Sequence, residues 1–314
     1  MGLSKPLHKV ESTERIAKGA SRYVHLADAL RVHQWTKNVL VFVPLVMAHK
    51  IFDGRALLLT FYAFIAWCLC VSGVYLLNDR LDLEADRLHP RKRFRPLASG
   101  ALGPKFLWFL IPVLLISSFA VAFTILPPAF GVSLLLYFAL TTAYSIYLKR
   151  ILIVDVLLLA GLYALRVLSG GFAAHIPVSP WLLAFSMFLF LSLAFVKRYA
   201  ELQSLKELGR SETSRRSYSM RDAEFLKSFG SASGYLSVLV LVLYINSREV
   251  VVLYHRPTVL WLIGPCLLYW ITRVWLLAQR GEMDEDPILF TVKDGPSYVV
   301  GLFVAVVIVA ATLS

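Results

Sequence analysis

The sequence predicts an all-α integral membrane protein with about nine transmembrane helices. Of its 314 residues, 58% are hydrophobic and only 17% are charged, whereas a soluble domain usually carries about 25% charged residues. The charges are also unevenly placed, since residues 106–148 contain no Asp, Glu, Lys or Arg. Uncharged stretches of this kind match the length of about 20 residues that a helix needs to cross a bilayer.

The apolar stretches and the breaks between them predict the order of the elements. Pro127 and Pro128 divide the long uncharged stretch, because proline cannot continue a helix and disfavours one at the preceding residue. Residues 1–24 are polar and basic and lack the short apolar core of a signal peptide, so we expect an N-terminal arm there and a single polytopic domain at 25–314. The expected spans are 25–48, 56–77, 106–125, 129–148, 152–172, 180–197, 229–247, 257–278 and 296–313.

Basic residues gather in alternate connections between the spans. The connections after the second, fourth and sixth spans are rich in Lys and Arg, and positive charge marks the cytoplasmic side. We therefore expect the N-terminus and these connections on the cytoplasmic side of the plasma (inner) membrane, and the C-terminus outside. Placed beside apolar spans, the net charge of +12 indicates a lipid bilayer as partner and no nucleic acid. Cys68, Cys70 and Cys266 fall inside spans and are interpreted as packing residues.

Three aspartates follow the second span at helical spacing. Asp79, Asp82 and Asp86 stand at i, i+3 and i+7, so a continuing helix places them on one face together with Asn78. Such a stripe suits Mg²⁺, which takes oxygen ligands and commonly joins one or two carboxylates to substrate phosphates. The alternative is a solvated helix balanced by arginines, but ionisable groups at the mouth of a membrane helix tend to be functional. The donors expected to meet phosphate oxygens just downstream are Lys92 and Arg95.

The other basic connections carry further candidate substrate contacts. A tyrosine one turn before a Lys-Arg pair can form a sugar-phosphate site, although positive-inside placement explains the pair equally well. These candidates at the end of the fourth span are Tyr144, Tyr147, Lys149 and Arg150. Lys197, Arg198 and Glu201 end the sixth span and bring two cations and an acid within about one turn.

Two further features remain open in the sequence. Arg166 lies in the middle of a span, where an unpaired charge is costly. It is either functional or paired with Asp155, about three turns away. The acidic segment 281–294 is either a solvated loop or a segment that helps to close the site.

The aspartate motif carries a family resemblance. The pattern N-D-x-x-D-x-x-x-D from Asn78, followed by HPxKxxRPLASG, resembles the UbiA-type prenyltransferase superfamily. RVHQWTKN at 31–38, AYSIYLKR at 143–150 and VKRYAEL at 196–202 are similar to its decaprenyl-phosphate phosphoribosyltransferase branch. The resemblance implies a helical bundle with a cytoplasmic-side active site and Mg²⁺ held by the aspartates and Asn78. It also implies that Lys37, which otherwise reads as an interfacial anchor, contacts a phosphate.

One departure from the superfamily pattern bears on the substrate. Aromatic prenyltransferases of the superfamily carry a second Asp-rich motif after the sixth span, whereas here only Glu201 remains among basic residues. Cations at that place suit a phosphorylated acceptor. The resemblance thus implies transfer of 5-phosphoribose from phosphoribosyl diphosphate to polyprenyl phosphate, releasing diphosphate, towards a lipid-linked arabinose donor for cell-wall polysaccharide. Prenyl transfer to an aromatic or other acceptor is the alternative, a transporter is a remote one, and a homo-oligomer is left open.

Overall fold

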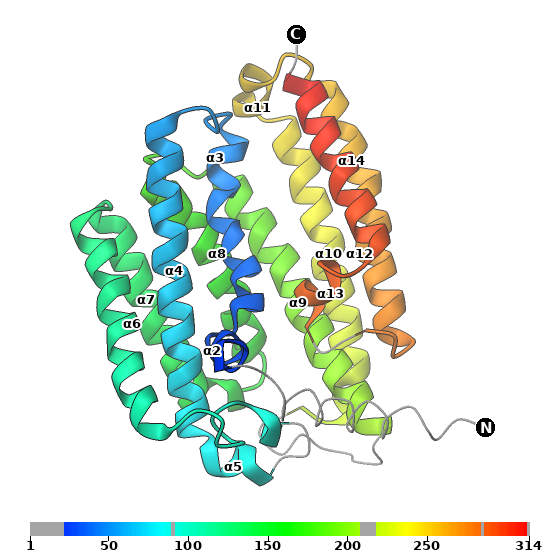
Figure 1. Ribbon diagram of the computed structural model, residues 1–314. Helices are drawn as coiled ribbons and strands as arrows, with labels where there is room; N and C mark the ends of the chain where they lie inside the picture. The colour runs from blue at the N-terminus through cyan, green and yellow to red at the C-terminus, as the bar shows by residue number, and fades with distance from the viewer. Residues whose placement is uncertain (1–21, 89–91, 208–217, 284–285, 313–314) are drawn as a thin grey trace. The chain divides into compact units, whose positions relative to one another are not determined.

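The computed structural model describes residues 22–88, 92–207, 218–283 and 286–312, and every element in these ranges is a helix (Figure 1). The predicted all-α class is therefore confirmed. The arm predicted at 1–24 lies outside the described residues up to residue 21, and its last three residues open the first helix. In chain order the helices are α2 (Arg22–Leu30), η1 (Val32–Phe42), α3 (Val43–Met47), α4 (Gly54–Leu81), α5 (Leu83–Leu88), η2 (Lys92–Phe94), α6 (Pro104–Thr124), α7 (Pro128–Ile146), η3 (Leu148–Arg150), α8 (Val154–Ala174), α9 (Pro180–Glu207), η4 (Met220–Asp222), α10 (Ala223–Ile245), α11 (Arg248–Leu253), η5 (Pro257–Leu262), α12 (Ile263–Gln279), α13 (Pro287–Thr291) and α14 (Gly295–Thr312).

Within the described residues, eight helical segments are long and apolar enough to span a membrane, one fewer than predicted. The difference lies in the first expected span, 25–48, which the structure divides into α2, η1 and α3. Arg31 has a φ of +51° and ends α2, a left-handed conformation that a continuous helix does not contain. The polar run from Gln34 to Asn38 lies in the 3₁₀-helix η1. The remaining eight predicted spans each correspond to one candidate span.

The break between α6 and α7 and the end of α9 can be compared with the predicted spans. The break at Pro127 and Pro128 is confirmed, because α6 ends at Thr124 and α7 begins at Pro128. The predicted end of the sixth span at residue 197 is wrong, because α9 continues to Glu207. Lys, Arg, Glu and Gln are good helix formers and extend the helix beyond its apolar part. Lys197, Arg198 and Glu201 consequently lie inside a helix, which fixes their spacing.

Of the described residues, those within 22–39 and 58–138 form one compact unit, and those within 40–57 and 139–312 form a second. The core of the first unit joins α2, α4 and α6 through buried residues that include Ala29, Leu76 and Leu107. The Ser118 hydroxyl donates to the Ala66 carbonyl at 2.7 Å, a contact that ties α6 to α4. This packing supports the last turn of α4, which carries Asn78 and Asp79.

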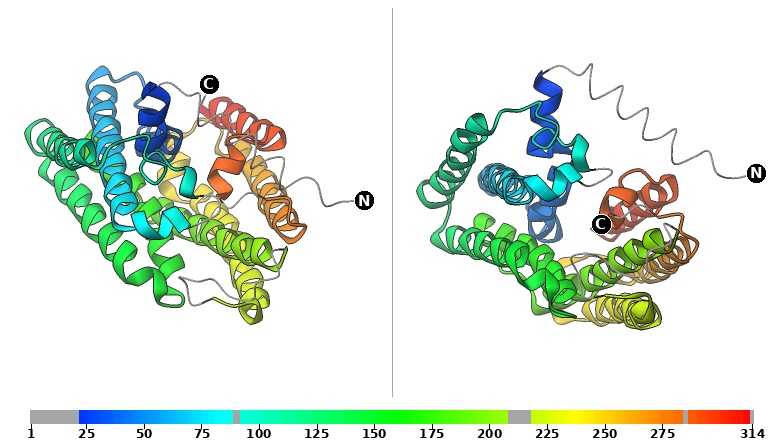
Figure 2. Two further views of the ribbon diagram at one scale, coloured as in Figure 1. Left: turned by 60° about the horizontal axis from the view of Figure 1, so that its bottom comes forward. Right: turned by 90° about the horizontal axis from the view of Figure 1, so that it is seen from below.

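The core of the second unit is built on α8, α9, α10 and α12. The α9 and α10 helices lie side by side in both views of Figure 2. Gly230 of α10 permits close packing on both neighbours, because a Cβ there would stand 2.2 Å from the Trp275 ring of α12 and 2.6 Å from Cβ of Phe195 in α9. The Trp275 indole in turn donates to Ser192 of α9 at 3.1 Å. Large side chains and one glycine thus lock three helices together.

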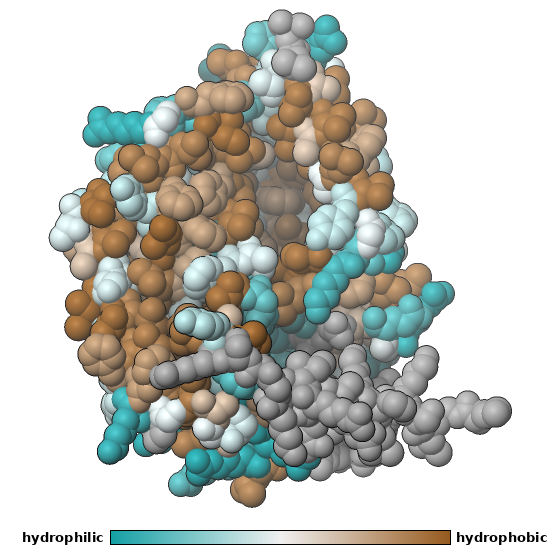
Figure 3. Space-filling view, viewed as in Figure 1, coloured by the Kyte–Doolittle hydropathy of each residue, from teal (hydrophilic) through white to brown (hydrophobic). Residues whose placement is uncertain are grey.

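The outward faces of the spans are apolar. Figure 3 shows hydrophobic residues over much of the visible helical surface, with hydrophilic residues gathered toward the helix ends. Phe109 of α6 is 69% exposed and Leu302 of α14 is 68% exposed. Exposed apolar surface of this extent is costly in water but suits contact with lipid tails. The protein is accordingly a multi-pass membrane protein.

Candidate functional site

Two buried aspartates at the end of α4 and in α5 bind one arginine. Nη1 of Arg95 donates to Oδ1 of Asp79 at 3.0 Å and to Oδ2 of Asp86 at 2.5 Å. The side chains of Asp79 and Asp86 are only 7% and 3% exposed. The predicted single helix is interrupted at Asp82, because α4 ends at Leu81 and α5 begins at Leu83. The helical hydrogen-bond spacing still continues across the break, since the N–H of Asp82 bonds to the Asn78 carbonyl and that of Asp86 to the Asp82 carbonyl. The stripe thus brings Asp79 and Asp86 onto a single cationic nitrogen.

Arg31 is a second cation at this cluster, and the sequence reasoning did not single it out. Its Nη2 donates to Oδ1 of Asp79 at 2.7 Å, and its guanidinium lies over the Tyr75 ring at 4.4 Å. The Ser72 hydroxyl donates to the Leu30 carbonyl, and Trp35 donates to Ser72. These bonds fasten the left-handed turn at Arg31 onto α4. The one available signal was that Arg31 opens the motif at 31–38.

The donor set at this cluster fits a hard divalent cation. Carboxylate oxygens of Asp79 and Asp86 converge on one point, which a nitrogen now fills, and Mg²⁺ prefers oxygen ligands. In the described part of the chain, no three His, Cys, Asp or Glu residues gather as a ready-made metal cluster. Asn78 and Asp82 are half-buried on the same helical stretch, and Lys92 opens η2 next to Arg95.

A second polar cluster, in the other unit, centres on Arg198 of α9, whose side chain is 1% exposed. Its Nε donates to Asp155 at 2.5 Å, its Nη1 to both carboxylate oxygens of Glu201, and its Nη2 to the Tyr144 hydroxyl at 2.8 Å. All four contacts are charge-assisted, and three of them go to carboxylate oxygens, so the two acids neutralise this buried cation. The Arg198 guanidinium thus joins two other predicted site residues, Tyr144 and Glu201, and it also binds an acid, Asp155, that was not among them.

Tyr218 completes the second cluster and supports a strained turn. Its hydroxyl donates to Oδ1 of Asp155 at 2.8 Å and accepts the N–H of Ile153 at 3.0 Å. Ile153 has a φ of +67°, which is rare for a β-branched residue and costs about 1–3 kcal/mol. Burial raises the pKa of Tyr218, and the charge of Asp155 raises it further, so the phenol stays protonated. No sequence spacing indicated Tyr218, because it lies 63 residues from Asp155.

The remaining predicted site residues differ in solvent exposure and lie in different elements. Lys37 is 7% exposed on η1, whereas Tyr147, at the end of α7, is 61% exposed. Lys149 and Arg150 lie on η3, half-buried and exposed respectively. The structure places Lys149 and Arg150 in the same unit as the Arg198 cluster and Lys37 in the unit of the aspartates.

Arg166 resolves one alternative that the sequence left open. Asp155 binds Arg198 and Tyr218, whereas Nη1 of Arg166 donates to the Leu162 carbonyl one turn back at 2.8 Å. Its guanidinium also lies 5.4 Å from the centre of the Tyr163 ring. The suggested pair between Arg166 and Asp155 is therefore wrong: along α8 the two residues stand about 16 Å apart.

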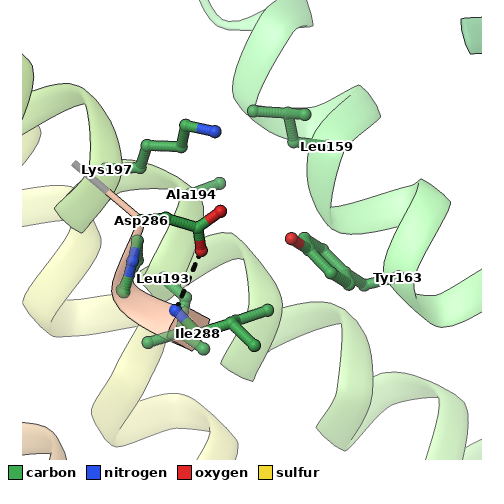
Figure 4. Close-up of a pocket in the computed structure, with 8 residues that line it drawn as sticks. Leu159, Tyr163, Leu193, Ala194, Lys197, Asp286 and Ile288 are labelled. Atoms are coloured by element: carbon green, nitrogen blue, oxygen red, sulfur yellow. Dashed lines mark hydrogen bonds between the residues drawn. The ribbon is translucent and has the colours of Figure 1, made fainter. Parts of the chain in front are cut away.

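A pocket beside α9 combines an apolar wall with polar groups (Figure 4). Lys197 and Asp286 reach it from α9 and from the start of α13, and the Tyr163 hydroxyl points toward it from α8. Asp286 caps α13 by accepting the N–H groups of Ile288 and Leu289. Part of the acidic segment 281–294 is thus a folded wall of this pocket rather than only a solvated loop. The other lining residues are Leu159, Leu193, Ala194, Pro287 and Ile288.

The described part of the chain contains eight candidate spans and two buried ion clusters near helix ends, which together define a polytopic helical membrane protein. The chain belongs to the UbiA prenyltransferase family, whose model matches residues 39–311. It is accordingly an integral membrane enzyme of the transferase class.

The chain is similar in sequence to several curated proteins over most of its length. The chain is 36% identical over 90% of its length to the uncharacterized protein y4nM of Sinorhizobium fredii, and it spans 55% of that protein. It is 34% identical to the nodulation protein NoeC of Azorhizobium caulinodans, covering 88% of this chain and 90% of NoeC. It is 33% identical to decaprenyl-phosphate phosphoribosyltransferase of Mycolicibacterium smegmatis, covering 71% of each.

Solved structures share the fold. A UbiA homologue from Archaeoglobus fulgidus, solved with DMAPP and Mg²⁺, superposes with a TM-score of 0.66. The match covers 93% of this chain and 99% of that one at 16% sequence identity. At this identity the likeness establishes the UbiA-type helical fold alone.

Proposed function

We propose that the protein is a Mg²⁺-dependent transferase that moves 5-phosphoribose from phosphoribosyl diphosphate to a polyprenyl phosphate. The observation that carries the proposal is the convergence of Asp79 and Asp86 on a single cationic nitrogen, with Arg31 beside it. Two carboxylates around one cation position, flanked by guanidinium groups, suit a metal-bound diphosphate. The relative from M. smegmatis supports the phosphoribosyl donor, and the A. fulgidus homologue with Mg²⁺ supports the metal.

The aspartate stripe would hold the donor. Asp79, Asp82 and Asp86, with Asn78, would provide the oxygen ligands of the metal. When bound, Mg²⁺ neutralises charge on the departing diphosphate. Arg31, Arg95 and Lys92 would donate to the diphosphate oxygens, and the buried Lys37 would add positive potential from η1. Placing these donors before the reaction begins is the main contribution of the protein to catalysis.

The transfer itself needs no strong base. The bond between C1 of the ribose and the diphosphate oxygen breaks, and its electron pair leaves with the diphosphate. An oxygen of the lipid phosphate forms the new bond to C1 from the opposite face, which inverts the configuration. That oxygen is already anionic near neutral pH, so the protein has only to orient it.

The second unit would hold the acceptor. Lys197 lies at a pocket whose other walls include Leu159 and Leu193, a combination that suits a phosphate joined to a hydrocarbon chain. Two cations on η3, Lys149 and Arg150, would extend the phosphate site, and the hydroxyl of Tyr147 just before them would add a hydrogen-bond donor. Arg198, Glu201 and Tyr144 would position this region through their mutual bonds rather than by contacting the phosphate.

Prenyl transfer from a prenyl diphosphate is the second candidate. The observation in its favour is that two acids share Arg198: Glu201, at the place where a second acidic motif would be expected, and Asp155 from the start of α8. NoeC, a relative of similar identity, does not identify the acceptor by its name. Phosphoribosyl transfer is favoured because the arginine that neutralises these two acids is only 1% exposed, whereas Arg95 at the aspartates is 28% exposed and more easily displaced.

An assay of the purified protein would decide between the two. The protein is incubated with polyprenyl phosphate, labelled phosphoribosyl diphosphate and Mg²⁺, and the lipid phase is extracted. We expect label in the lipid, its loss on adding a chelator, and its loss in Asp79→Asn and Asp82→Asn variants that remain folded in detergent. Absence of lipid label in the folded wild type, together with turnover of labelled prenyl diphosphate, would establish the second candidate instead.

A further inference from the structure

Arg95 fills the space between the two carboxylates with one nitrogen. We infer that Arg95 is the resident cation of this site in the metal-free protein, and that the metal binds by displacing it. The displaced guanidinium then becomes a donor to the diphosphate. This inference rests on the metal and diphosphate of the proposed function, and it adds a coupling between them.

The metal has to displace Arg95 because the aspartate oxygens already accept hydrogen bonds from arginines. Oδ1 of Asp79 already accepts from Arg31 at 2.7 Å and from Arg95 at 3.0 Å, and a carboxylate oxygen offers about two lone pairs. Both aspartates are nearly sealed from solvent. A cation that takes these oxygens as ligands therefore competes with an arginine for the same electron pairs.

The anchoring of the two arginines indicates which one moves. Arg31 is held by the fastened turn between α2 and η1 and by its stacking on Tyr75. Arg95 follows the three-residue helix η2, and both of its described side-chain hydrogen bonds go to the carboxylates. Its side chain is 28% exposed, against 21% for Arg31. Arg95 can thus leave without disturbing a packed element.

If the metal displaces Arg95, removing Arg95 should change the affinities for metal and for diphosphate in opposite directions. Metal alone must break the charge-assisted bonds of Arg95, so it binds weakly. With diphosphate present, the released guanidinium regains an anionic partner. Removing Arg95 should therefore tighten metal binding and weaken diphosphate binding.

The test measures Mn²⁺ binding by electron paramagnetic resonance in detergent, with no substrate present. Arg95→Gln should bind Mn²⁺ about tenfold more tightly than wild type, and should bind labelled inorganic diphosphate at saturating Mn²⁺ about tenfold less tightly. Arg87→Gln is the matched control, because it removes the same charge from an exposed position on α5. Arg87→Gln should leave the Mn²⁺ affinity within about twofold of wild type, since exposed charges act weakly.

Three outcomes would overturn the inference. Weaker Mn²⁺ binding in folded Arg95→Gln would show that Arg95 supports the carboxylates, and equal tightening in Arg87→Gln would show a general charge effect. Both leave the proposed function standing if lipid labelling persists. Failure of wild type to bind Mn²⁺ with or without diphosphate would remove the metal proposal as well. If Arg95→Gln does not fold, Arg95→Lys, whose single ammonium forms fewer bonds, should show the same two shifts at smaller size.

Discussion

Lys197 and Arg198 are neighbours in the sequence with opposite surroundings. Arg198 is 1% exposed and binds Asp155 and Glu201, whereas Lys197 is half-buried at the rim of a pocket. The sequence predicts phosphate contacts for both residues, because both stand in the same basic motif. A helix turns about 100° per residue, so one of the pair faces the core of the unit and the other does not.

Substitution of Arg198 should mainly lower stability, whereas substitution of Lys197 should mainly weaken substrate binding. Arg198→Ala leaves two acids without their cation, so we expect a loss of about 3–5 kcal/mol in unfolding free energy. Lys197→Ala should change stability by about 0.5 kcal/mol or less while raising KM for polyprenyl phosphate. Thermal unfolding in detergent and steady-state kinetics provide the two measurements. A stable Arg198→Ala variant with only a raised KM would reverse these roles.

Asp294 should produce a pH-dependent stability at the start of α14. Burial alone would raise its pKa, but hydrogen bonds from Arg273 and Ser297 hold the pKa below its ordinary value of 3.8. The folded state therefore favours the carboxylate, and this stabilisation is present above pH 3.8 and lost as the pH falls through the lower folded-state pKa. Asp294→Asn should melt at a lower temperature than wild type at pH 6, and the difference should shrink toward pH 3. A difference that does not change with pH would exclude the ion pair as its cause.

At the scale of elements, α8 illustrates how glycines divide into packed and unpacked positions. A Cβ on Gly170 would stand 2.0 Å from the backbone oxygen of Val41, whereas a Cβ on Gly161 would have no neighbour within 4 Å. Both glycines lie in the same helix. The chain before α4 therefore crosses α8 with backbone contact at Gly170.

Alanine at the two positions should act in opposite directions. Gly170→Ala forces a backbone to move, so we expect a loss of about 1–3 kcal/mol or more. Gly161→Ala removes a flexible residue from a helix and should be neutral or stabilising by up to about 1 kcal/mol. Melting temperatures in the same detergent compare the two directly. Equal effects would mean that the approach of Val41 to α8 does not persist in solution.

Most elements could be predicted from the sequence, and the exceptions have physical reasons. Apolar length located eight of the nine expected spans because hydropathy is a local property. The first span was expected to be continuous, but its polar run lies in η1 after a left-handed turn at Arg31. The end of α9 was placed too early because charged residues end an apolar span without ending a helix.

At the scale of the whole molecule, the length of α4 shows which residues can lie on opposite sides of the membrane. Its 28 residues extend about 42 Å, longer than a hydrocarbon core of about 30 Å. Phe52 before it is 96% exposed, and Arg87 in α5 after it is exposed. These two positions therefore report on opposite sides of the membrane.

Cysteine labelling tests the proposed sidedness. In a background without Cys68, Cys70 and Cys266, a membrane-impermeant maleimide should label Phe52→Cys in intact cells. Arg87→Cys should react only after permeabilisation, because the basic connections are expected on the cytoplasmic side. The opposite pattern would invert the topology and move the aspartates to the outer face.

The helical membrane class, the aspartate stripe and the family resemblance could all be predicted from the residues alone, because hydrophobic length and helical spacing act over short stretches of chain. The contacts of Arg31 and Arg95 with Asp79, and those of Arg198 with Asp155, Glu201 and Tyr144, became evident only in the folded chain. Arg31 and Asp79 are 48 residues apart, and Tyr218 and Asp155 are 63 apart. A buried charge takes whichever partner the packing brings near, and local periodicity carries no information about that choice.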